Sequence, residues 1–211
     1  MDAAVLDELL DSAAALRAGS GRAILGLAGA PAAGKSTLAQ RLADRDPERT
    51  IVVPMDGFHL AHRELVRLGR AGRKGAPDTF DVDGYRALLA RLRAPTNGEI
   101  VYAPAFAREL EEPIAGAIAV LPEHTLVITE GNYLLYDNGG WARVPELLDA
   151  VWFVEIDDDR RRERLLERHV RFGRTESEAR AWVASTDDPN ARLIAATRGR
   201  ADRIVHLVGN R

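Results

Sequence analysis

The sequence contains no cysteine, which excludes disulfides, zinc–thiolate sites and cysteine nucleophiles. It also lacks a basic excess, because 29 lysines and arginines face 32 aspartates and glutamates and the formal net charge is -3. Nucleic-acid-binding domains usually carry such an excess. No apolar run approaches the roughly 18 residues that a membrane helix requires. We therefore expect no nucleic-acid partner and no membrane partner.

Two further absences concern metal binding and targeting. The five histidines are scattered, and none belongs to an HExxH or similar metal-binding pair. The chain starts with Met1 and Asp2 and has no basic stretch followed by an apolar core, so we expect no secretory signal. The cytoplasm is then the default location.

The chain has 211 residues, of which 46% are hydrophobic and 29% are charged. This length and composition predict one domain, residues 1–211, with enough apolar material for a full core. The helical spacing of apolar residues over 2–18 predicts an amphipathic helix within an N-terminal segment, residues 1–20.

Continuous apolar runs alternate with helical patterns along the rest of the chain. Strands that are apolar on both faces are typical of a parallel sheet covered by helices on both sides. The sequence therefore predicts a three-layer α/β/α fold with a mainly parallel five-stranded sheet. The predicted strands are 23–28, 51–53, 125–129, 150–156 and 203–208, and the predicted helices are 35–43, 58–70, 158–171, 175–185 and 190–199.

A further helix is predicted between a cap at Asp81 or Asp83 and a break at residues 95–98. Its inner face is expected to carry Tyr85, Leu88, Leu89 and Leu92. Before it, residues 71–82 predict a loop rich in glycine and charge. After it, residues 99–113 predict a short strand at 100–103 and an irregular loop. The region 71–112 is expected to face the substrate.

Residues 29–36 match the phosphate-binding pattern G-x-x-x-x-G-K-[ST] in full, between a predicted strand and a predicted helix. A chance match in a chain of this length is on the order of one in a hundred. Glycines let successive backbone N–H groups point at an anion, the lysine neutralises the β- and γ-phosphates, and the serine hydroxyl ligates Mg²⁺. The predicted nucleotide contacts are Gly29, Ala30, Pro31, Ala32, Ala33, Gly34, Lys35, Ser36 and Thr37.

Two carboxylates follow predicted strands, and ligands of such sheets bind at strand carboxyl ends. Asp56 either accepts a proton from a substrate hydroxyl or holds Mg²⁺, and the alternative is an aspartate in an Asp-Gly turn. Glu130 has the position of an acidic residue that holds Mg²⁺ directly or through water. The alternative for Glu130 is a capping role at the end of its strand.

The segment 157–174 contains seven arginines and is expected to form a mobile lid, within residues 158–187. At 100° per residue, four of them fall in one sector, opposite Leu166 and Val170. We expect Arg168 and Arg171 to stabilise charge on a transferring phosphoryl group, and the other arginines to lie on a solvated face. The four arginines of that sector are Arg161, Arg164, Arg168 and Arg171.

Several markers together resemble the phosphoribulokinase/uridine kinase/type I pantothenate kinase family of P-loop kinases, over nearly the whole chain. Bacterial nucleoside/nucleotide kinase proteins and fructose-transport kinases are the most similar group. This resemblance implies ATP and Mg²⁺ as cofactors, a general-base role for Asp56 and a Mg²⁺ role for Glu130. The markers are GAPAAGKST (29–37), MDGFH (55–59), RKGAPDTFD (73–81), VYAPAF (101–106) and ITEGNYLL (128–135).

The resemblance also implies a basic residue near the substrate at Lys74. Loops beside an α/β site often determine specificity, so Tyr102, Phe106 and Arg108 are further candidates for binding the substrate. Glu130 and His59 are candidates as well, although a packing role is the favoured interpretation of His59. The acceptor class stays open between a nucleoside, a sugar and a pantothenate-like compound.

We therefore predict phosphoryl transfer from MgATP to a hydroxyl of a small-molecule substrate. A GTPase is disfavoured because no N-K-x-D motif is present. A P-loop ATPase and a nucleotide-binding regulator remain the alternatives, and a homodimer stays open.

Overall fold

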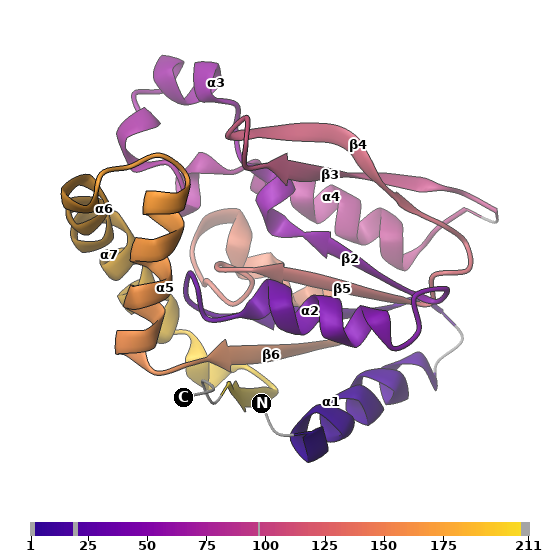
Figure 1. Ribbon diagram of the computed structural model, residues 1–211. Coiled ribbons are helices and arrows are strands. Elements are labelled where there is room, and N and C mark those ends of the chain that lie inside the picture. Colours follow the sequence, from indigo (N-terminus) through magenta and orange to yellow (C-terminus); the bar gives the residue numbers. More distant parts are fainter. Residues whose placement is uncertain (1–2, 19–20, 97, 208–211) are drawn as a thin grey trace.

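The computed structural model describes residues 3–18, 21–96 and 98–207, and its main feature is a five-stranded parallel sheet of order β2-β5-β1-β6-β7 (Figure 1). The predicted fold class is confirmed. Residues 1, 2, 19 and 20 of the predicted N-terminal segment and residue 208 of the predicted last strand lie outside the described residues. The strands are β1 (Ala23–Ala28), β2 (Thr50–Pro54), β5 (Leu126–Gly131), β6 (Ala150–Glu155) and β7 (Arg203–His206).

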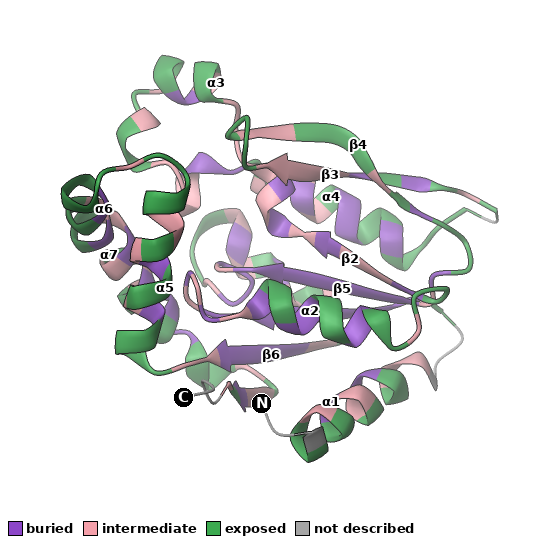
Figure 2. Ribbon diagram, in the orientation of Figure 1, coloured by how far each residue is buried: buried purple, intermediate pink, exposed green. Residues whose placement is uncertain are grey.

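The central strands are buried on both faces, which explains their continuous apolar sequences (Figure 2). In β1, Ile24 belongs to one hydrophobic cluster, whereas Leu25 and Leu27 belong to a second cluster on the other face. Helices α1 (Ala3–Ala15) and α2 (Lys35–Asp44) pack on the second cluster. Helix α4 (Val82–Arg93) packs on the first, so the three-layer prediction is confirmed (Figure 1).

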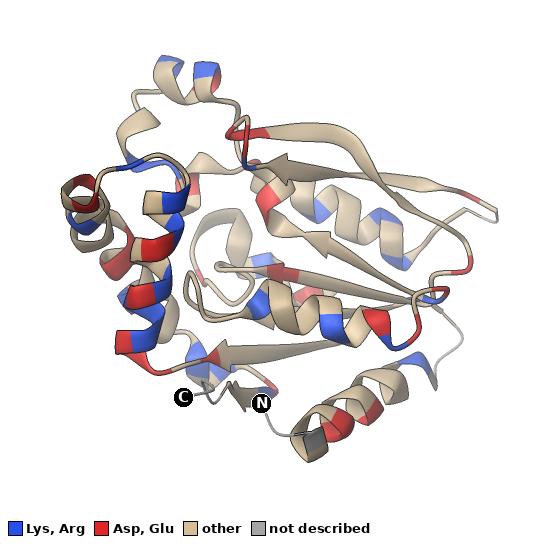
Figure 3. Cartoon of the chain, in the orientation of Figure 1, with Lys and Arg blue, Asp and Glu red and all other residues tan. Residues whose placement is uncertain are grey.

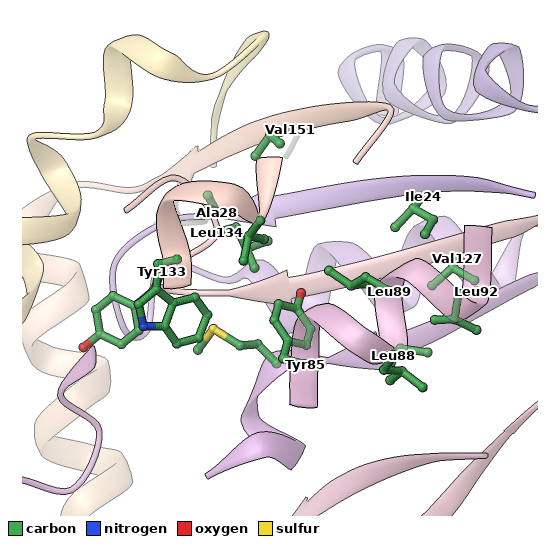
Figure 4. Close-up of a cluster of buried hydrophobic side chains, with 14 of the residues drawn as sticks. Ile24, Ala28, Tyr85, Leu88, Leu89, Leu92, Val127, Tyr133, Leu134 and Val151 are labelled. Atoms are coloured by element: carbon green, nitrogen blue, oxygen red, sulfur yellow. The ribbon is translucent and has the colours of Figure 1, made fainter. Parts of the chain in front are cut away.

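Helix α4 contacts the sheet through the four residues that its periodicity selects, Tyr85, Leu88, Leu89 and Leu92 (Figure 4). Asp81 caps the helix by accepting a hydrogen bond from the Gly84 backbone N–H at 2.9 Å. The buried Tyr85 hydroxyl lies 2.7 Å from Thr129 Oγ1, and Thr129 Oγ1 donates to the Val53 carbonyl at 2.7 Å. This chain of hydrogen bonds satisfies polar groups in the middle of an apolar layer.

Of the predictions for residues 99–113, the strand at 100–103 is confirmed from residue 101 onward, but the irregular loop after it is wrong. Residues Val101–Ala107 (β3) and Glu112–Val120 (β4) form an antiparallel hairpin that lies at the top of the molecule in Figure 1. Strand β4 reads EPIAGAIAV, and its alanines, glycine and proline are weak strand formers. The hairpin is held by tertiary packing, because Val101, Ala103 and Val120 are buried in the first hydrophobic cluster, together with Ile24 and helix α4.

The region before α4 is less helical than the sequence suggests. The predicted helix 58–70 shortens to α3 (His62–Arg67), and a 3-10 turn at Met55–Phe58 precedes it. The loop 71–82 contains short 3-10 turns at Ala71–Arg73 and Pro77–Thr79. The remaining 3-10 turns are Leu16–Ala18, Gly139–Arg143, Pro145–Leu147 and Arg198–Arg200.

The last helices lie at one end of the sheet, beside the start of α2 (Figure 1). They are α5 (Asp158–Arg171), α6 (Glu176–Trp182) and α7 (Asp188–Ala195), with a π-helical turn at Val183–Asp187 between the last two. Asp157 caps α5, and Thr175 forms a capping box with Glu178 at α6. Within the described ranges, none of these or the other helices is long and apolar enough to span a membrane.

Candidate active site

The P-loop connects β1 to α2 in a tight turn that requires glycine at two positions. A Cβ atom on Gly29 would lie 2.2 Å from the Val154 carbonyl oxygen, so the loop approaches β6 too closely for a side chain. Gly34 has φ 98°, and Ala32 also adopts positive φ, 63°. Helix α2 begins directly at Lys35 with no side-chain cap, which leaves its first N–H groups available to an anion.

The Lys35 ammonium is buried against the loop that precedes it. Its Nζ donates to the carbonyls of Gly29 at 2.9 Å and Ala30 at 3.0 Å and to Asn132 Oδ1 at 2.8 Å. Burial lowers the pKa of Lys35, and the negative charge of Glu130 acts against this shift. Asn132 was not singled out from the sequence, although it follows Glu130 by two positions at the end of β5.

Ser36 and Glu130 form the second polar contact of the loop. The Ser36 hydroxyl donates to Glu130 Oε1 at 2.7 Å, and Glu130 is 7% exposed. Burial raises the pKa of the Glu130 carboxyl, the charge of Asp56 raises it further, and Lys35 acts in the opposite direction.

The oxygen atoms of Ser36 and Glu130 fit Mg²⁺, which prefers hard oxygen ligands. The described part of the chain contains no cluster of three or more histidine, aspartate or glutamate ligands. A metal held here therefore has to take further ligands from phosphate and water, which is the usual mode for Mg²⁺. Both residues were predicted for this role from the sequence.

One cavity of about 940 Å³ joins the strand ends to the helices beyond them. Its lining includes the P-loop from Lys35 to Thr37, Asp56 after β2 and Glu130 in β5. The carboxyl ends of parallel strands meet at one edge of the sheet, which is why positions far apart in sequence share this cavity. Of the predicted loop residues, Pro31, Ala32, Gly34, Lys35, Ser36 and Thr37 line it, whereas Gly29, Ala30 and Ala33 are not among its lining residues.

Asp56 lies in the 3-10 turn after β2, which packs tightly on the hairpin. A Cβ atom on Gly57 would lie 2.3 Å from the Pro104 carbonyl oxygen, so this turn fits against β3 only with glycine. The nearest charged partner of the Asp56 carboxylate is Arg108, whose guanidinium lies 3.4 Å from Oδ2. The carboxylate therefore faces the cavity from a turn that is fixed by backbone packing.

Aromatic rings line the part of the cavity next to Asp56. The His59 ring packs between Phe80 and Phe106, with ring centroids 4.0 and 4.7 Å away. Burial lowers the pKa of His59, and the charge of Asp56 acts against this shift. His59 packs as the sequence suggested and also lines the cavity with Phe106 and Arg108. Tyr102, in contrast, is 58% exposed on the hairpin and is not a lining residue.

Helix α5 carries basic and acidic residues along its length (Figure 3), and its arginines differ in their partners. The first three pair with nearby carboxylates, among them Arg161 with Asp158 at 2.7 Å and with Asp188 at 2.8 Å. Arg164 and Arg168 line the cavity, and neither has an ion pair among the described residues. Arg171 is exposed and lies outside the lining.

Helix α5 buries Leu165 and Arg161, whereas Val170, which the helical projection places opposite the basic sector, is 45% exposed. Arg161 is buried because Asp188, at the start of α7, provides it with a carboxylate partner. A pairing between two helices is not visible in a helical projection of one of them.

The structure adds further lining residues from α5 to α7 that the sequence did not select. His169 Nε2 lies 2.7 Å from Asp187 Oδ2, in the wall formed by the π-helical turn. The Arg174 guanidinium stacks 3.8 Å from the centre of the Trp182 ring. Turns with π geometry often occur at functional sites, and this one is a feature of the structure that the predicted helix over 175–185 does not indicate.

Comparison with known proteins gives consistent relatives, although no protein-family model matches the chain. A Schizosaccharomyces pombe protein named "Putative uridine kinase" is 35% identical over 189 residues, covering 84% of this chain and 80% of that protein. Escherichia coli YggC is 35% identical over 191 residues, covering 88% and 78%. A solved Silicibacter structure titled "putative fructose transport system kinase" has a TM-score of 0.86 at 38% identity, covering 95% and 98%.

Proposed function

Because this chain belongs to the uridine kinase-like family of P-loop kinases, we propose that it transfers the γ-phosphoryl group of ATP to a hydroxyl group of a small metabolite. The observation that carries this proposal is the single cavity in which Asp56 faces Lys35 and Glu130. A carboxylate, a phosphate-binding lysine and a metal-binding carboxylate are the groups that phosphoryl transfer requires.

The P-loop binds the triphosphate in this mechanism. Backbone N–H groups at the start of α2 donate to the phosphates, and Lys35 places its positive charge beside them. The three acceptors that now hold the Lys35 ammonium, two of them P-loop carbonyls, keep it next to the loop without neutralising its charge. The side chain is therefore pre-positioned for an anion.

Ser36 and Glu130 would hold Mg²⁺, which neutralises charge on the β- and γ-phosphates when bound. Their direct hydrogen bond would be replaced by metal ligation, since both oxygens already point at one another. The carboxyl of Glu130 must be ionised for this role. Its raised pKa means that metal affinity weakens as the pH falls, at a higher pH than for an ordinary glutamate.

Asp56 would orient the acceptor hydroxyl and accept its proton. Arg168, and Arg164 beside it on α5, would stabilise the charge spread over the transferring group. Closure of α5–α7 as a lid over the cavity would exclude water, which would otherwise take the phosphoryl group.

A P-loop ATPase is the main alternative, and the cavity favours a kinase. An ATPase needs room for water beyond the γ-phosphate. This cavity extends past Asp56 to an aromatic and basic wall that contains Phe106, Lys74 and Arg108. Such a wall suits an organic acceptor, because apolar surfaces and a few placed polar groups are typical of small-molecule sites.

The test is ADP release from MgATP with a panel of nucleosides, sugars and hydroxy acids. We expect release that depends on one acceptor class, and Asp56→Asn should retain ATP binding but lower transfer by roughly 100-fold or more, as loss of a general base does. Asp137→Asn is the matched control, because Asp137 is 71% exposed and lies outside the cavity. Equal ADP release without any acceptor would favour the ATPase, and unchanged turnover in Asp56→Asn would remove it as the base.

A further inference from the structure

Two cations line the part of the cavity around Asp56. We call this part the acceptor half and define it by Asp56, His59, Lys74, Phe106 and Arg108, which all line the cavity. Neither Lys74 nor Arg108 has a hydrogen bond or ion pair to a P-loop residue within the described ranges, because their partners there are Glu111 and Asp56.

Lys74 is fixed in the wall of the acceptor half. Its side chain is 15% exposed, its Nζ lies 5.1 Å from the centre of the Phe106 ring, and it donates to the backbone carbonyl of Glu111. The Glu111 carboxylate is farther away, at 3.8 Å, and is 63% exposed, so water screens most of its charge. The Glu111 carbonyl and the Phe106 ring thus fix the position of the ammonium, which keeps further N–H donors for a ligand.

The hairpin turn that carries Glu111 is itself anchored over the cavity. Glu111 adopts φ 53°, an uncommon conformation for a residue other than glycine. The next residue, Glu112, accepts a hydrogen bond from the backbone N–H of His62 at 3.0 Å, which ties the hairpin to α3. Because Lys74 bonds to residue 111 and Arg108 lies three positions before it, both cations are brought to the same edge of the acceptor half.

Arg108 forms an ion pair with Asp56, and this contact has to change when an acceptor binds to Asp56. Its guanidinium lies 3.4 Å from Asp56 Oδ2, its one ion pair within the described ranges. An acceptor hydroxyl that hydrogen-bonds to Asp56 competes with Arg108 for the same carboxylate. The displaced guanidinium, which is 42% exposed and no longer paired with Asp56, is then available to bind another anion.

The neighbouring groups do not provide that anion. Arg168 faces the same space, where burial lowers the pKa of its guanidinium and the positive charge of Arg108 lowers it further. His59, whose pKa burial lowers, is not an anion in either protonation state. The other carboxylates of the lining already have partners: Glu130 accepts from Ser36, Asp187 is held by His169 at 2.7 Å, and the exposed Glu111 lies 3.8 Å from Lys74.

From this arrangement we propose that the acceptor is a hydroxylated metabolite that carries its own anionic group, a carboxylate or a phosphate, which Lys74 and Arg108 bind together. The proposal rests on the kinase activity proposed above and narrows its substrate class. The hydroxyl lies at Asp56, the carbon body packs on Phe106 and His59, and the anion replaces Asp56 as the partner of Arg108. A neutral nucleoside or sugar would leave both cations without a counter-charge.

The first test uses acceptor pairs that differ only in charge. With MgATP, ADP release and product are measured for glycerol, D-glycerate and glycerol 3-phosphate, for ribose and ribose 5-phosphate, and for pantothenyl alcohol and pantothenate, with uridine as a neutral nucleoside. We expect turnover with charged members alone, and the carboxylate and phosphate arms identify which anion is used. Turnover with neutral members, alone or equally, overturns the inference and leaves the kinase proposal intact.

The second test uses variants of the two cations. Lys74→Gln and Arg108→Gln should each raise the KM of the charged acceptor by roughly 10- to 100-fold, the effect of one hydrogen bond to a charged group. The KM of ATP should stay within about twofold, because Lys74 and Arg108 bond to Glu111 and Asp56 and not to P-loop residues within the described ranges. Arg73→Gln is the matched control: Arg73 precedes Lys74, is exposed, pairs with Asp78 at 2.5 Å and does not line the cavity.

A third measurement decides the question if the panel shows no transfer. With AMP-PNP and Mg²⁺ filling the nucleotide site, inorganic phosphate is added at constant ionic strength and the unfolding midpoint is recorded. We expect a higher midpoint for the wild-type chain and for Arg73→Gln, and no rise for the Lys74→Gln, Arg108→Gln double variant. An equal rise in the double variant overturns the inference. ADP release that never depends on an acceptor would instead count against the kinase.

Discussion

Arg168 and Arg171 differ in the structure although they were equivalent in the sequence, and this difference leads to the sharpest prediction. Both lie on α5, three residues apart, in the sector that the helical projection selected. Arg168 lines the cavity and has no ion pair in the part of the chain that the structure describes. Arg171 is exposed, with its guanidinium 6.0 Å from the centre of the Phe172 ring.

We expect Arg168→Gln to lower kcat by about 100- to 1000-fold. A donor aimed at charge that develops in a transition state is worth about 2.7–4 kcal/mol in a site that excludes water, and this value corresponds to that range of rates. Arg171→Gln should change kcat by less than about twofold, because substitutions of exposed side chains away from a site have small effects. Arg168→Lys should recover part of the lost rate, since it restores the charge but not the planar fork of donors.

The assay is steady-state ADP release with the acceptor that the panel identifies, at saturating ATP. Circular dichroism and the thermal unfolding midpoint show whether each variant is folded. If the two glutamine variants lose activity equally, the lining of the cavity does not decide which arginine acts. If Arg168→Gln retains more than about a third of the wild-type kcat, the proposed role of Arg168 is wrong.

Two further predictions concern the turn that carries Asp56, the proposed general base, and the His59 ring next to it. Gly57→Ala should cost about 1–3 kcal/mol of unfolding free energy and also lower kcat, because its Cβ would meet the Pro104 carbonyl at 2.3 Å. Gly72→Ala is the control, because its Cβ would have nothing within 4 Å, and it should change neither quantity in denaturant titrations and rate assays. Equal losses in both variants would refute the packing argument. Burial lowers the pKa of His59 below its ordinary value of about 6.5, so its contribution to stability is present above that pH and is lost as the pH falls through the lowered pKa. His59→Gln should therefore lose less unfolding free energy than the wild-type chain between about pH 7.5 and pH 5, and parallel pH profiles would contradict this.

Most of the fold could be predicted because its signals are local. Each strand of the main sheet is a continuous apolar run, and α4 shows its buried face in the spacing of Tyr85, Leu88, Leu89 and Leu92. The hairpin of β3 and β4 was missed because its strand signal is not local. It pairs Val101 with Val120, and the alanines, glycine and proline of β4 form a strand only when a partner and a core are already in place.

The residues of the candidate site also fall into those with a local sequence signal and those placed by packing between distant segments. Gly34, Lys35 and Ser36 could be predicted because a P-loop is built from consecutive residues, whose backbone makes the phosphate site by itself. Asp56 and Glu130 could be selected because each follows or ends a predicted strand, and the carboxyl ends of parallel strands meet at one edge of a sheet. These positions needed no knowledge of how distant segments pack.

The sequence by itself thus determined the class of fold, the phosphate-binding loop and the two carboxylates, because periodicity and contiguous motifs encode them. The tertiary structure alone decided that Arg168 and not Arg171 faces the cavity, that Asn132 meets Lys35 across 97 positions and that Arg108 meets Asp56 across 52. The physical reason is that these contacts depend on the relative placement of whole elements. That placement is set by the summed packing of many side chains rather than by any local pattern.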